Sequence, residues 1–154
     1  MDVFGVSIPN KPLSNLDLLF YADKLKIPNF RGVYMRDALP QTPKKVECGI
    51  MNFNTKDQPG SHWVCWSKNK DRIYFDSFGQ ITPIEIQKYL KKKSEYGCGV
   101  IMRNTDIVQP INTVVCGHLC LFVLKALGED WSFQKTLDYL NGYSQTHWKA
   151  PKTI

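Results

Sequence analysis

The stretch QPINTVVCGHLCLF, residues 109–122, passes without a break from a polar loop into a continuous apolar segment. The pattern predicts a helix over about 115–127, closed by Gly128. Because this segment is hydrophobic around its whole circumference, we expect the helix to lie buried at the centre of the fold. Cys116 is predicted at its N-terminus, and Gly117 follows it.

Periodic patterns on both sides of this helix predict the other elements. Helices are predicted over about 15–26, 83–94 and 132–141, and strands over 31–35, 46–53, 62–67, 72–77 and 100–102. Ser14 and Asp17 form the pattern of a capping box at the start of the first helix. The polar turn at 68–71 joins two of the strands in a hairpin. This order of elements predicts an α+β fold with a mostly antiparallel central sheet around the buried helix, in a single domain over 1–154.

The composition limits the class of protein. The chain has 154 residues, of which 43% are hydrophobic and 22% charged, and its formal net charge is +6. It opens without a signal-peptide pattern, and its apolar runs are too short to cross a bilayer, so we expect a soluble protein that is not secreted and has no membrane partner. The positive charge is concentrated in four lysine clusters, at 44–45, at 68–72, at 88–93 and in the last residues. These clusters are either solvated faces or a surface that attracts nucleic acid.

The cysteines favour a reducing compartment. There are five of them, without a C-x-x-C pair, so they indicate neither a disulfide framework nor a zinc ribbon. Cys116 and Cys120 share one face of the predicted helix, but further ligands at a suitable spacing are missing from the sequence. We therefore predict no metal site.

The hairpin places a histidine near a carboxylate. If its turn centres near Asn69, the antiparallel register brings His62 directly opposite Asp76, on the same face. A carboxylate beside an imidazole holds its tautomer and raises its pKa, as a general base or the cation of a thiolate–imidazolium pair requires. A register slip of one residue would put the two side chains on opposite faces.

The N-terminus of the central helix is a place for a reactive thiol. There the backbone N–H groups and the positive end of the helix dipole favour the thiolate of Cys116. Gly117 would leave room beside the sulfur for a substrate carbonyl, and Gln109 could donate to an oxyanion together with the N–H of Cys116. With His62 and Asp76, these residues supply the nucleophile, base, orienting group and oxyanion donor of an acyl-transfer site.

Each residue also has a more ordinary interpretation. A buried cysteine such as Cys116 is more often inert than reactive. Asp76 could begin a turn, and Gln109 before a proline is common in loops. Two other histidines are weaker candidates for the base, because His118 projects to a different side of the helix and His147 lies near the C-terminus without a predicted anchor.

Three motifs together resemble a known family. GSHWVCW (60–66), IYFDSFG (73–79) and Gln109 followed by VVCGHLC (114–120) are similar to the His-Trp, Asp/Glu-x-Phe-Gly and Gln…Cys-Gly motifs of the adenovirus protease (adenain) family. Relatives of that family occur in adenovirus-like and polinton-type elements, and the SUMO-specific (Ulp-type) proteases are more distant. The resemblance extends over roughly 14–128, including the opening helix and FRGVYMRDALP.

The resemblance implies a papain-like site on an α+β cysteine protease fold. In that site His62 is the base, Asp76 orients it, Cys116 is the nucleophile and Gln109 contributes to the oxyanion hole, with Trp63 beside them. The implied activity is that of a cysteine endopeptidase that cleaves viral capsid or core precursors at Gly-containing sites during virion maturation. Its substrates are polypeptides, and no metal or small-molecule cofactor is expected.

The resemblance also implies partners and a location. Adenovirus protease is activated by a short viral peptide and binds DNA, so an activating peptide and nonspecific DNA are expected as cofactors. Cys98 stands where that peptide could attach through a disulfide; the alternative is a small core residue. We expect a monomer in the virion and in the nucleus or cytoplasm of the host cell.

Three alternative functions stay open at this point. The first is an isopeptidase acting on ubiquitin-like modifiers, which would share the fold and the site residues. The second is an inactive DNA- or peptide-binding scaffold, against which the complete set of four site residues argues. The third is an acyltransferase using the same cysteine, histidine and aspartate, for which the sequence offers no separate support.

Overall fold

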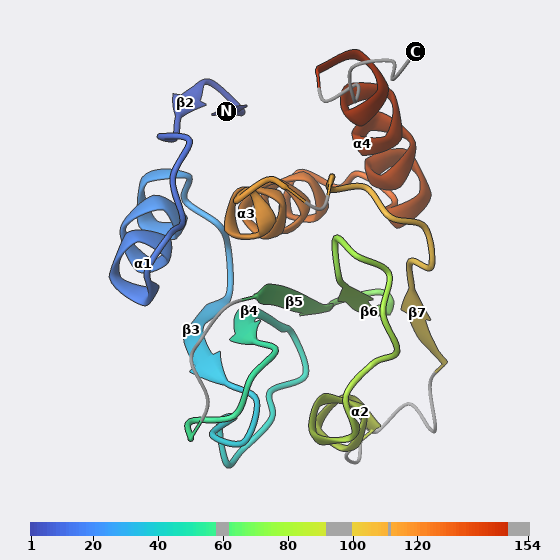
Figure 1. Cartoon of the computed structure of the whole chain (residues 1–154). Coiled ribbons are helices and arrows are strands. Elements are labelled where there is room, and N and C mark those ends of the chain that lie inside the picture. Colours follow the sequence, from blue (N-terminus) through green and yellow to red (C-terminus); the bar gives the residue numbers. More distant parts are fainter. Residues whose placement is uncertain (58–61, 92–99, 111, 148–154) are drawn as a thin grey trace.

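The computed structural model describes residues 1–57, 62–91, 100–110 and 112–147. Its helices are α1 (Asn15–Lys24), α2 (Ile84–Lys91), α3 (Cys116–Gly128) and α4 (Phe133–His147). Its strands are β1 (Asp2–Val3), β2 (Val6–Ser7), β3 (Phe30–Met35), β4 (Glu47–Asn52), β5 (Trp63–Lys68), β6 (Arg72–Phe75) and β7 (Ile101–Arg103). Figure 1 shows these elements as three layers, with a sheet between two layers of helices.

The central sheet has the strand order β3-β4-β5-β6-β7 and is mixed. The two inner pairings, β4 with β5 and β5 with β6, are antiparallel, whereas β3 pairs with β4 and β6 with β7 in parallel. The prediction of a mostly antiparallel sheet is therefore corrected. Both edge strands are joined to their neighbours by crossover connections, and such a connection brings the chain back in the same direction.

The sequence patterns placed the helices and the long strands correctly, and the end of the helix predicted over 83–94 lies outside the described residues. Ser14 caps α1 as predicted, because its Oγ accepts a hydrogen bond from the N–H of Asp17 at 3.1 Å and the Asp17 carboxylate accepts one from the N–H of Ser14 at 3.0 Å. Helix α4 is longer than predicted. The β1–β2 hairpin was not predicted, since strands of two residues are too short to show a period.

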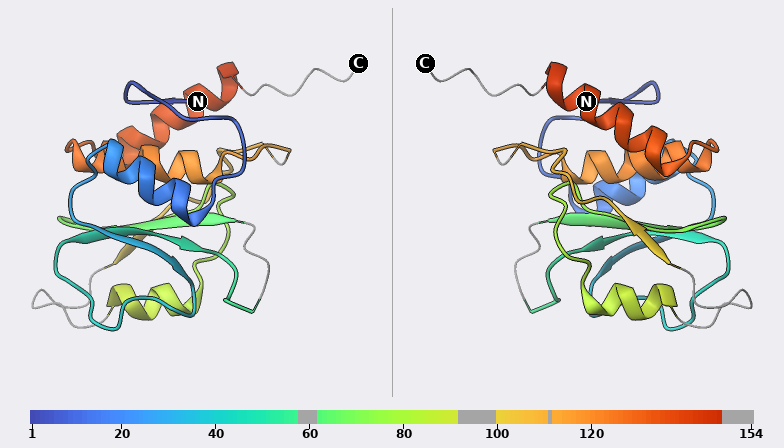
Figure 2. Two further views of the ribbon diagram at one scale, coloured as in Figure 1. Left: turned by 90° about the vertical axis from the view of Figure 1, so that its left-hand side faces the viewer. Right: turned by 90° about the vertical axis from the view of Figure 1, so that its right-hand side faces the viewer.

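The central helix α3 is buried as its composition predicted, with ten of its thirteen residues buried. It packs on one face of the sheet beside α1, with α4 on its outer side, and Figure 2 shows α2 alone against the opposite face. Two hydrophobic cores result, a larger one around α3 and a smaller one under α2. This packing brings the start of α3 close to the start of β5 and the end of β6.

Among the described residues, no helix is long and apolar enough to cross a membrane. The same part of the chain contains no cluster of three or more histidine, cysteine, aspartate or glutamate side chains that could hold a metal ion.

Candidate active site

His62 and Asp76 form the centre of the site. His62 immediately precedes β5 and Asp76 immediately follows β6, and Nε2 of the imidazole lies 2.7 Å from Oδ1 of the carboxylate. Both residues are buried, His62 being 8% exposed and Asp76 completely covered. The predicted contact between the two side chains is therefore present in the structure.

The route to this contact differs from the prediction. Cys65 pairs with Phe75 and Lys68 with Arg72, so the hairpin turn centres on Lys70, one residue later than predicted, and His62 is not directly opposite Asp76. A turn displaced by one residue shifts the pairing by two. Because side chains alternate with a period of two, this shift keeps both residues on the same face, where a diagonal pair is still within reach.

Asn104 holds the main chain of Asp76, a contact that the sequence analysis missed. Its Oδ1 accepts a hydrogen bond from the N–H of Asp76 at 3.1 Å, and its Nδ2 donates to the carbonyl of Asp76 at 2.6 Å. The N–H of Phe78 donates to Oδ1 of Asp76 at 2.8 Å. Neither periodicity nor a motif distinguishes Asn104, which follows the short strand β7.

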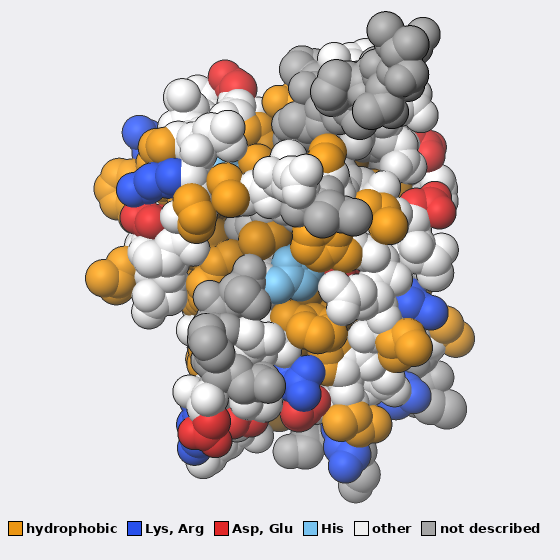
Figure 3. Space-filling view, in the orientation of Figure 1, with side chains coloured by type: hydrophobic (Ala, Val, Ile, Leu, Met, Phe, Trp, Pro, Cys, Tyr) orange, Lys and Arg blue, Asp and Glu red, His pale blue; other side chains and the backbone are white. Residues whose placement is uncertain are grey.

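The charge on His62 is stabilised by its neighbours. Burial alone would lower the pKa of His62, but its hydrogen bonds to Asp76 and to the side chain of Cys116 raise that pKa from the ordinary 6.5 to about 9. Since Nε2 is bound to Asp76, Nδ1 is the ring nitrogen left for the thiol. The rings of Phe53 and Phe78 flank the imidazole at centroid distances of 6.0 and 4.8 Å. Figure 3 shows a histidine on this face among hydrophobic side chains.

Cys116 is the first residue of α3, as predicted. The preceding residue, Val115, makes no side-chain capping hydrogen bond, so no side chain competes at the cap for the N–H groups of the first turn. Gly117 has a different role from the one predicted. A Cβ atom on Gly117 would lie 3.1 Å from Leu18 and 3.3 Å from Leu13, so this glycine allows close packing in the core and does not open space for substrate.

Gln109 is buried at 2% exposure and held at both ends of its carboxamide. Ser77 donates a hydrogen bond from Oγ to Oε1 of Gln109 at 2.6 Å, and Nε2 of Gln109 donates to the carbonyl of Thr113 at 2.9 Å. Ser77 directly follows Asp76. The structure therefore attaches Gln109 to the same short segment that holds His62, and Ser77 is a second residue that the sequence analysis missed.

The remaining predicted residues fall outside this centre. Trp63 is next to His62, and its indole N–H donates to the carbonyl of Leu13 at 2.8 Å, which ties the segment before α1 to β5. His118 is completely buried, its Nε2 lies 2.6 Å from the carbonyl of Pro9, and burial lowers its pKa, as expected of a neutral core histidine. Cys98 lies outside the described residues.

Three of the other cysteines, Cys48, Cys65 and Cys120, are free and buried. Burial raises the pKa of Cys48 to about 12 and also raises that of Cys120. Cys65 is buried between them and its thiol faces the carbonyl of Cys120 at 3.9 Å. Among the described cysteines, Cys116 is the one in contact with an imidazole.

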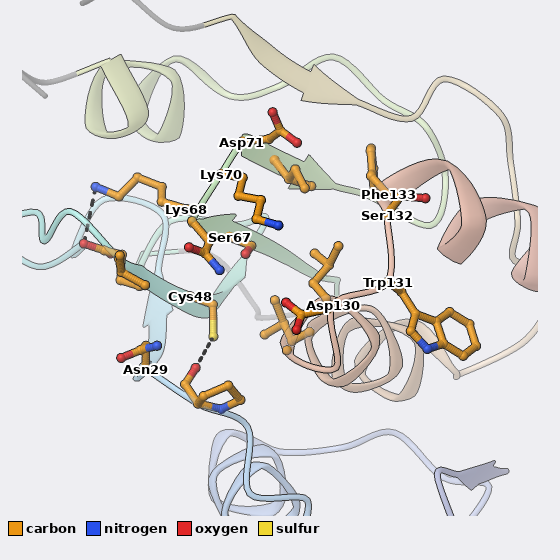
Figure 4. A pocket seen from close by; sticks show the side chains of 18 residues that line it. Asn29, Cys48, Ser67, Lys68, Lys70, Asp71, Asp130, Trp131, Ser132 and Phe133 are labelled. Atoms are coloured by element: carbon orange, nitrogen blue, oxygen red, sulfur yellow. Dashed lines mark hydrogen bonds and ion pairs between the residues drawn. The ribbon is translucent and has the colours of Figure 1, made fainter. Parts of the chain in front are cut away.

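A cavity of about 250 Å³ lies at the other end of α3. Figure 4 shows Lys70 and Asp71 of the hairpin turn on one side of it and Asp130 of the loop between α3 and α4 on the other, with the indole of Trp131 pointing away. Because thirteen helical residues span about 18 Å and Cys116 begins the helix, this cavity is separate from the candidate active site.

Comparisons with known proteins agree with the motifs. No protein-family model matches the chain. The protease of bovine adenovirus 2 is 28% identical over 127 residues, which cover 71% of this chain and 62% of the relative. The protease of porcine adenovirus A serotype 3 is 28% identical over 126 residues, covering 71% and 61%. The chain is similar in sequence to adenovirus proteases. It spans about three fifths of the length of these relatives.

Solved structures confirm the fold. The ASFV pS273R protease matches with a TM-score of 0.59 at 18% identity, covering 90% of this chain and 67% of the other. The SUMO protease Ulp1, determined with its catalytic cysteine oxidised to a sulfinic acid, matches with a TM-score of 0.50 at 15% identity, covering 86% and 75%. The predicted resemblance to the adenain and Ulp-type proteases is therefore confirmed.

Proposed function

We propose that this chain is a cysteine endopeptidase that cleaves viral capsid or core precursor proteins, at Gly-containing sites, during virion maturation. The contact of 2.7 Å between His62 and Asp76 carries the proposal, because it leaves the other ring nitrogen for Cys116 at the start of a helix. The similarity to adenovirus proteases supports the substrate class.

The geometry suits a two-step acyl transfer. The thiolate of Cys116 attacks the scissile carbonyl carbon, and the oxyanion that forms accepts hydrogen bonds from the N–H of Cys116 and from Nε2 of Gln109. The imidazolium of His62 gives its Nδ1 proton to the leaving amine as the C–N bond breaks, which leaves a thioester on Cys116. His62 then takes a proton from water, the resulting hydroxide attacks the thioester, and the acid product and the thiolate are released.

The first test measures the reactivity of the thiol and needs no substrate. At neutral pH we expect iodoacetamide to alkylate Cys116 at least tenfold faster than in the His62→Ala variant, because the imidazolium stabilises the thiolate. Peptide mass spectrometry locates the adduct, and the buried Cys48 and Cys65 serve as internal controls. Equal rates in the two proteins would contradict the proposal and favour an inactive scaffold.

The second test measures cleavage. Glycine-containing peptides from capsid and core precursors are incubated with the wild type and with Cys116→Ser, and the products are sequenced by mass spectrometry. We expect cleavage by the wild type alone. A chain that alkylates rapidly at Cys116 but cleaves none of these peptides would retain the reactive pair and contradict the proposed substrate.

One observation favours a second candidate, an isopeptidase acting on ubiquitin-like proteins. The fold is similar to that of a SUMO protease, although at 15% identity. A folded ubiquitin-like precursor ending beyond Gly-Gly and an unfolded peptide with the same cleavage site distinguish the two functions. Preference for the unfolded peptide supports the endopeptidase, whereas preference for the folded protein supports the isopeptidase.

The cofactors and location are also proposals that rest on the resemblance. We propose activation by a viral peptide, attached through Cys98, and by nonspecific binding of DNA to the lysine clusters, in a monomer that acts in the virion and in the nucleus or cytoplasm of the host cell. A peptide-mass adduct that reduction removes and Cys98→Ala prevents is the expected result for the peptide. Binding of DNA that weakens as salt is raised is the expected result for the lysines.

A further inference from the structure

The hydrogen bonds of Gln109 fix which way its carboxamide faces. The carbonyl oxygen of Thr113 can only accept, so the group that contacts it at 2.9 Å must be the NH₂ of Gln109. The opposite end of the amide is then Oε1, and the hydroxyl of Ser77 donates to it at 2.6 Å. The two partners agree on a single orientation, which the chemistry of Thr113 decides.

Both partners of Gln109 are themselves fixed by the main chain. The carbonyl of Ser77 accepts a hydrogen bond from the N–H of Val108 at 2.9 Å, which joins the segment after β6 to the residue before Gln109. The carbonyl of Pro110 accepts from the N–H of Thr113 at 3.1 Å and from its Oγ1 at 2.8 Å. The amide is therefore held between the carbonyl of Thr113 and a completely buried serine.

This arrangement leaves Nε2 with one hydrogen to offer. Of its two hydrogens, one is bound to the carbonyl of Thr113, and the other is available to an oxyanion. We propose that Ser77 is a positioning residue for the acyl transfer: its hydroxyl holds Oε1 of Gln109 and thereby directs the second N–H of Nε2 toward the oxyanion. This inference rests on the proposed function, since it assigns Ser77 to the oxyanion hole of that reaction.

Loss of the Ser77 hydroxyl should affect the transition state and not substrate binding. Without its donor, Oε1 keeps no partner at that end and the amide is held by Thr113 alone. Because the oxyanion exists only in the transition state and the tetrahedral intermediate, kcat falls while KM changes little. Removal of one oxyanion donor typically lowers kcat by about 100-fold, so a loosened donor is expected to lower it by about tenfold.

A double-mutant cycle tests whether Ser77 acts through Gln109. We expect Ser77→Ala to lower kcat about tenfold in the wild-type background and to have no further effect in the Gln109→Ala background. The alkylation rate of Cys116 stays at the wild-type level in Ser77→Ala, because His62 and Asp76 keep their contact. An equal loss of kcat in both backgrounds, or no loss in either, would overturn the proposal.

Ser132→Ala is the matched control for a loss of stability. It deletes a serine hydroxyl that accepts a hydrogen bond from the N–H of Lys135 at the start of α4, away from the candidate site. We expect this variant to lower the melting temperature without lowering kcat. A fall in kcat that follows melting temperature in Ser132→Ala as well as in Ser77→Ala would mean that Ser77 has only a structural role.

A spectroscopic measurement decides the inference even if no substrate is cleaved. The side-chain NH₂ resonances of Gln109, identified by their absence in Gln109→Glu, should exchange slowly with solvent in the wild type and at least tenfold faster in Ser77→Ala. Unchanged exchange would overturn the role of Ser77. The proposed function is judged separately, by the alkylation of Cys116 and the cleavage of peptides.

Discussion

Asn104 binds both the N–H and the carbonyl of Asp76 through the two ends of its carboxamide, at 3.1 and 2.6 Å. The two residues are 28 positions apart in the chain and come from the ends of neighbouring parallel strands. Asp76 is thereby fixed through its main chain, while its side chain is left to bind His62.

We expect Asn104→Ala to destabilise the protein by about 2 kcal/mol, because it leaves the buried N–H of Asp76 without a partner and leaves the carbonyl of Asp76 with Gly79 alone. Peptide cleavage should fall as well, since the carboxylate that orients His62 is no longer held. Urea denaturation measures the first effect and kcat the second. Asn69→Ala, at an exposed position of the hairpin turn, is the control, and a loss of stability as large in that variant would remove the special role of Asn104.

Stability should depend on pH through His62. Its folded pKa of about 9 lies above the unfolded value of 6.5, so the protonated histidine stabilises the fold fully below about pH 6.5, and this contribution is lost as the pH rises through 9. The loss amounts to at most about 3 kcal/mol. Urea denaturation between these pH values should show the decline in the wild type and a flatter profile in Asp76→Asn. Identical slopes would mean that the carboxylate does not raise the pKa of His62.

A buried ion-pair network on the α2 side of the sheet should dominate stability without affecting catalysis. Both oxygens of Glu47 are in use: Oε1 accepts hydrogen bonds from Trp66 at 3.0 Å and Tyr89 at 2.5 Å, and Oε2 lies 3.4 Å from Nζ of Lys68 and 3.3 Å from Arg31. Removal of the carboxylate leaves the charges of Lys68 and Arg31 without their partner. We therefore expect Glu47→Ala to lower the free energy of unfolding by about 3 kcal/mol.

The control for this variant is Glu129→Ala, which breaks the pair between Lys125 and the half-exposed Glu129 on one helix surface. That pair should contribute no more than about 0.5 kcal/mol. Chemical denaturation compares the two variants, and the alkylation rate of Cys116 should be unchanged in both. An equal loss in the free energy of unfolding in the two variants would mean that Glu47 is effectively solvated in the folded protein.

Gly79 closes the turn that follows Asp76 and cannot be replaced without strain. Its φ angle is +63°, its N–H donates to the carbonyl of Asp76 at 2.8 Å, and a Cβ atom would lie 2.4 Å from the carbonyl oxygen of Thr105. We expect Gly79→Ala to lower the free energy of unfolding by about 2 kcal/mol, because alanine is strained at this φ angle. It should also lower kcat, because the backbone next to Asp76 must move. Gly142→Ala, in open space on α4, should be neutral or stabilise the helix by up to about 1 kcal/mol. Thermal denaturation of the two variants checks the contrast, and similar melting temperatures would contradict it.

The sequence specified those parts of the fold that depend on local patterns. The all-round apolar run predicted a buried α3, and the turn between β5 and β6 predicted a hairpin whose ends carry His62 and Asp76. The parallel pairing of β3 with β4 and of β7 with β6 could not be predicted. It depends on the direction in which the long connections bring the chain back to the sheet. Ser77 and Asn104 were missed for a related reason: each acts on a residue about thirty positions away, and no local pattern records such a contact.

Asp76 and Ser77 are adjacent residues at the start of a turn, and their side chains bind different partners: Asp76 contacts His62, whereas Ser77 donates to Gln109. A single peptide bond thus joins the group that tunes proton transfer to the group proposed to align the amide. Insertion of one residue between them would move Ser77 away from Asp76, so the two contacts could no longer form together. Natural variation and protein engineering can therefore lengthen the loops around this dipeptide, but they cannot alter its length without losing both contacts together.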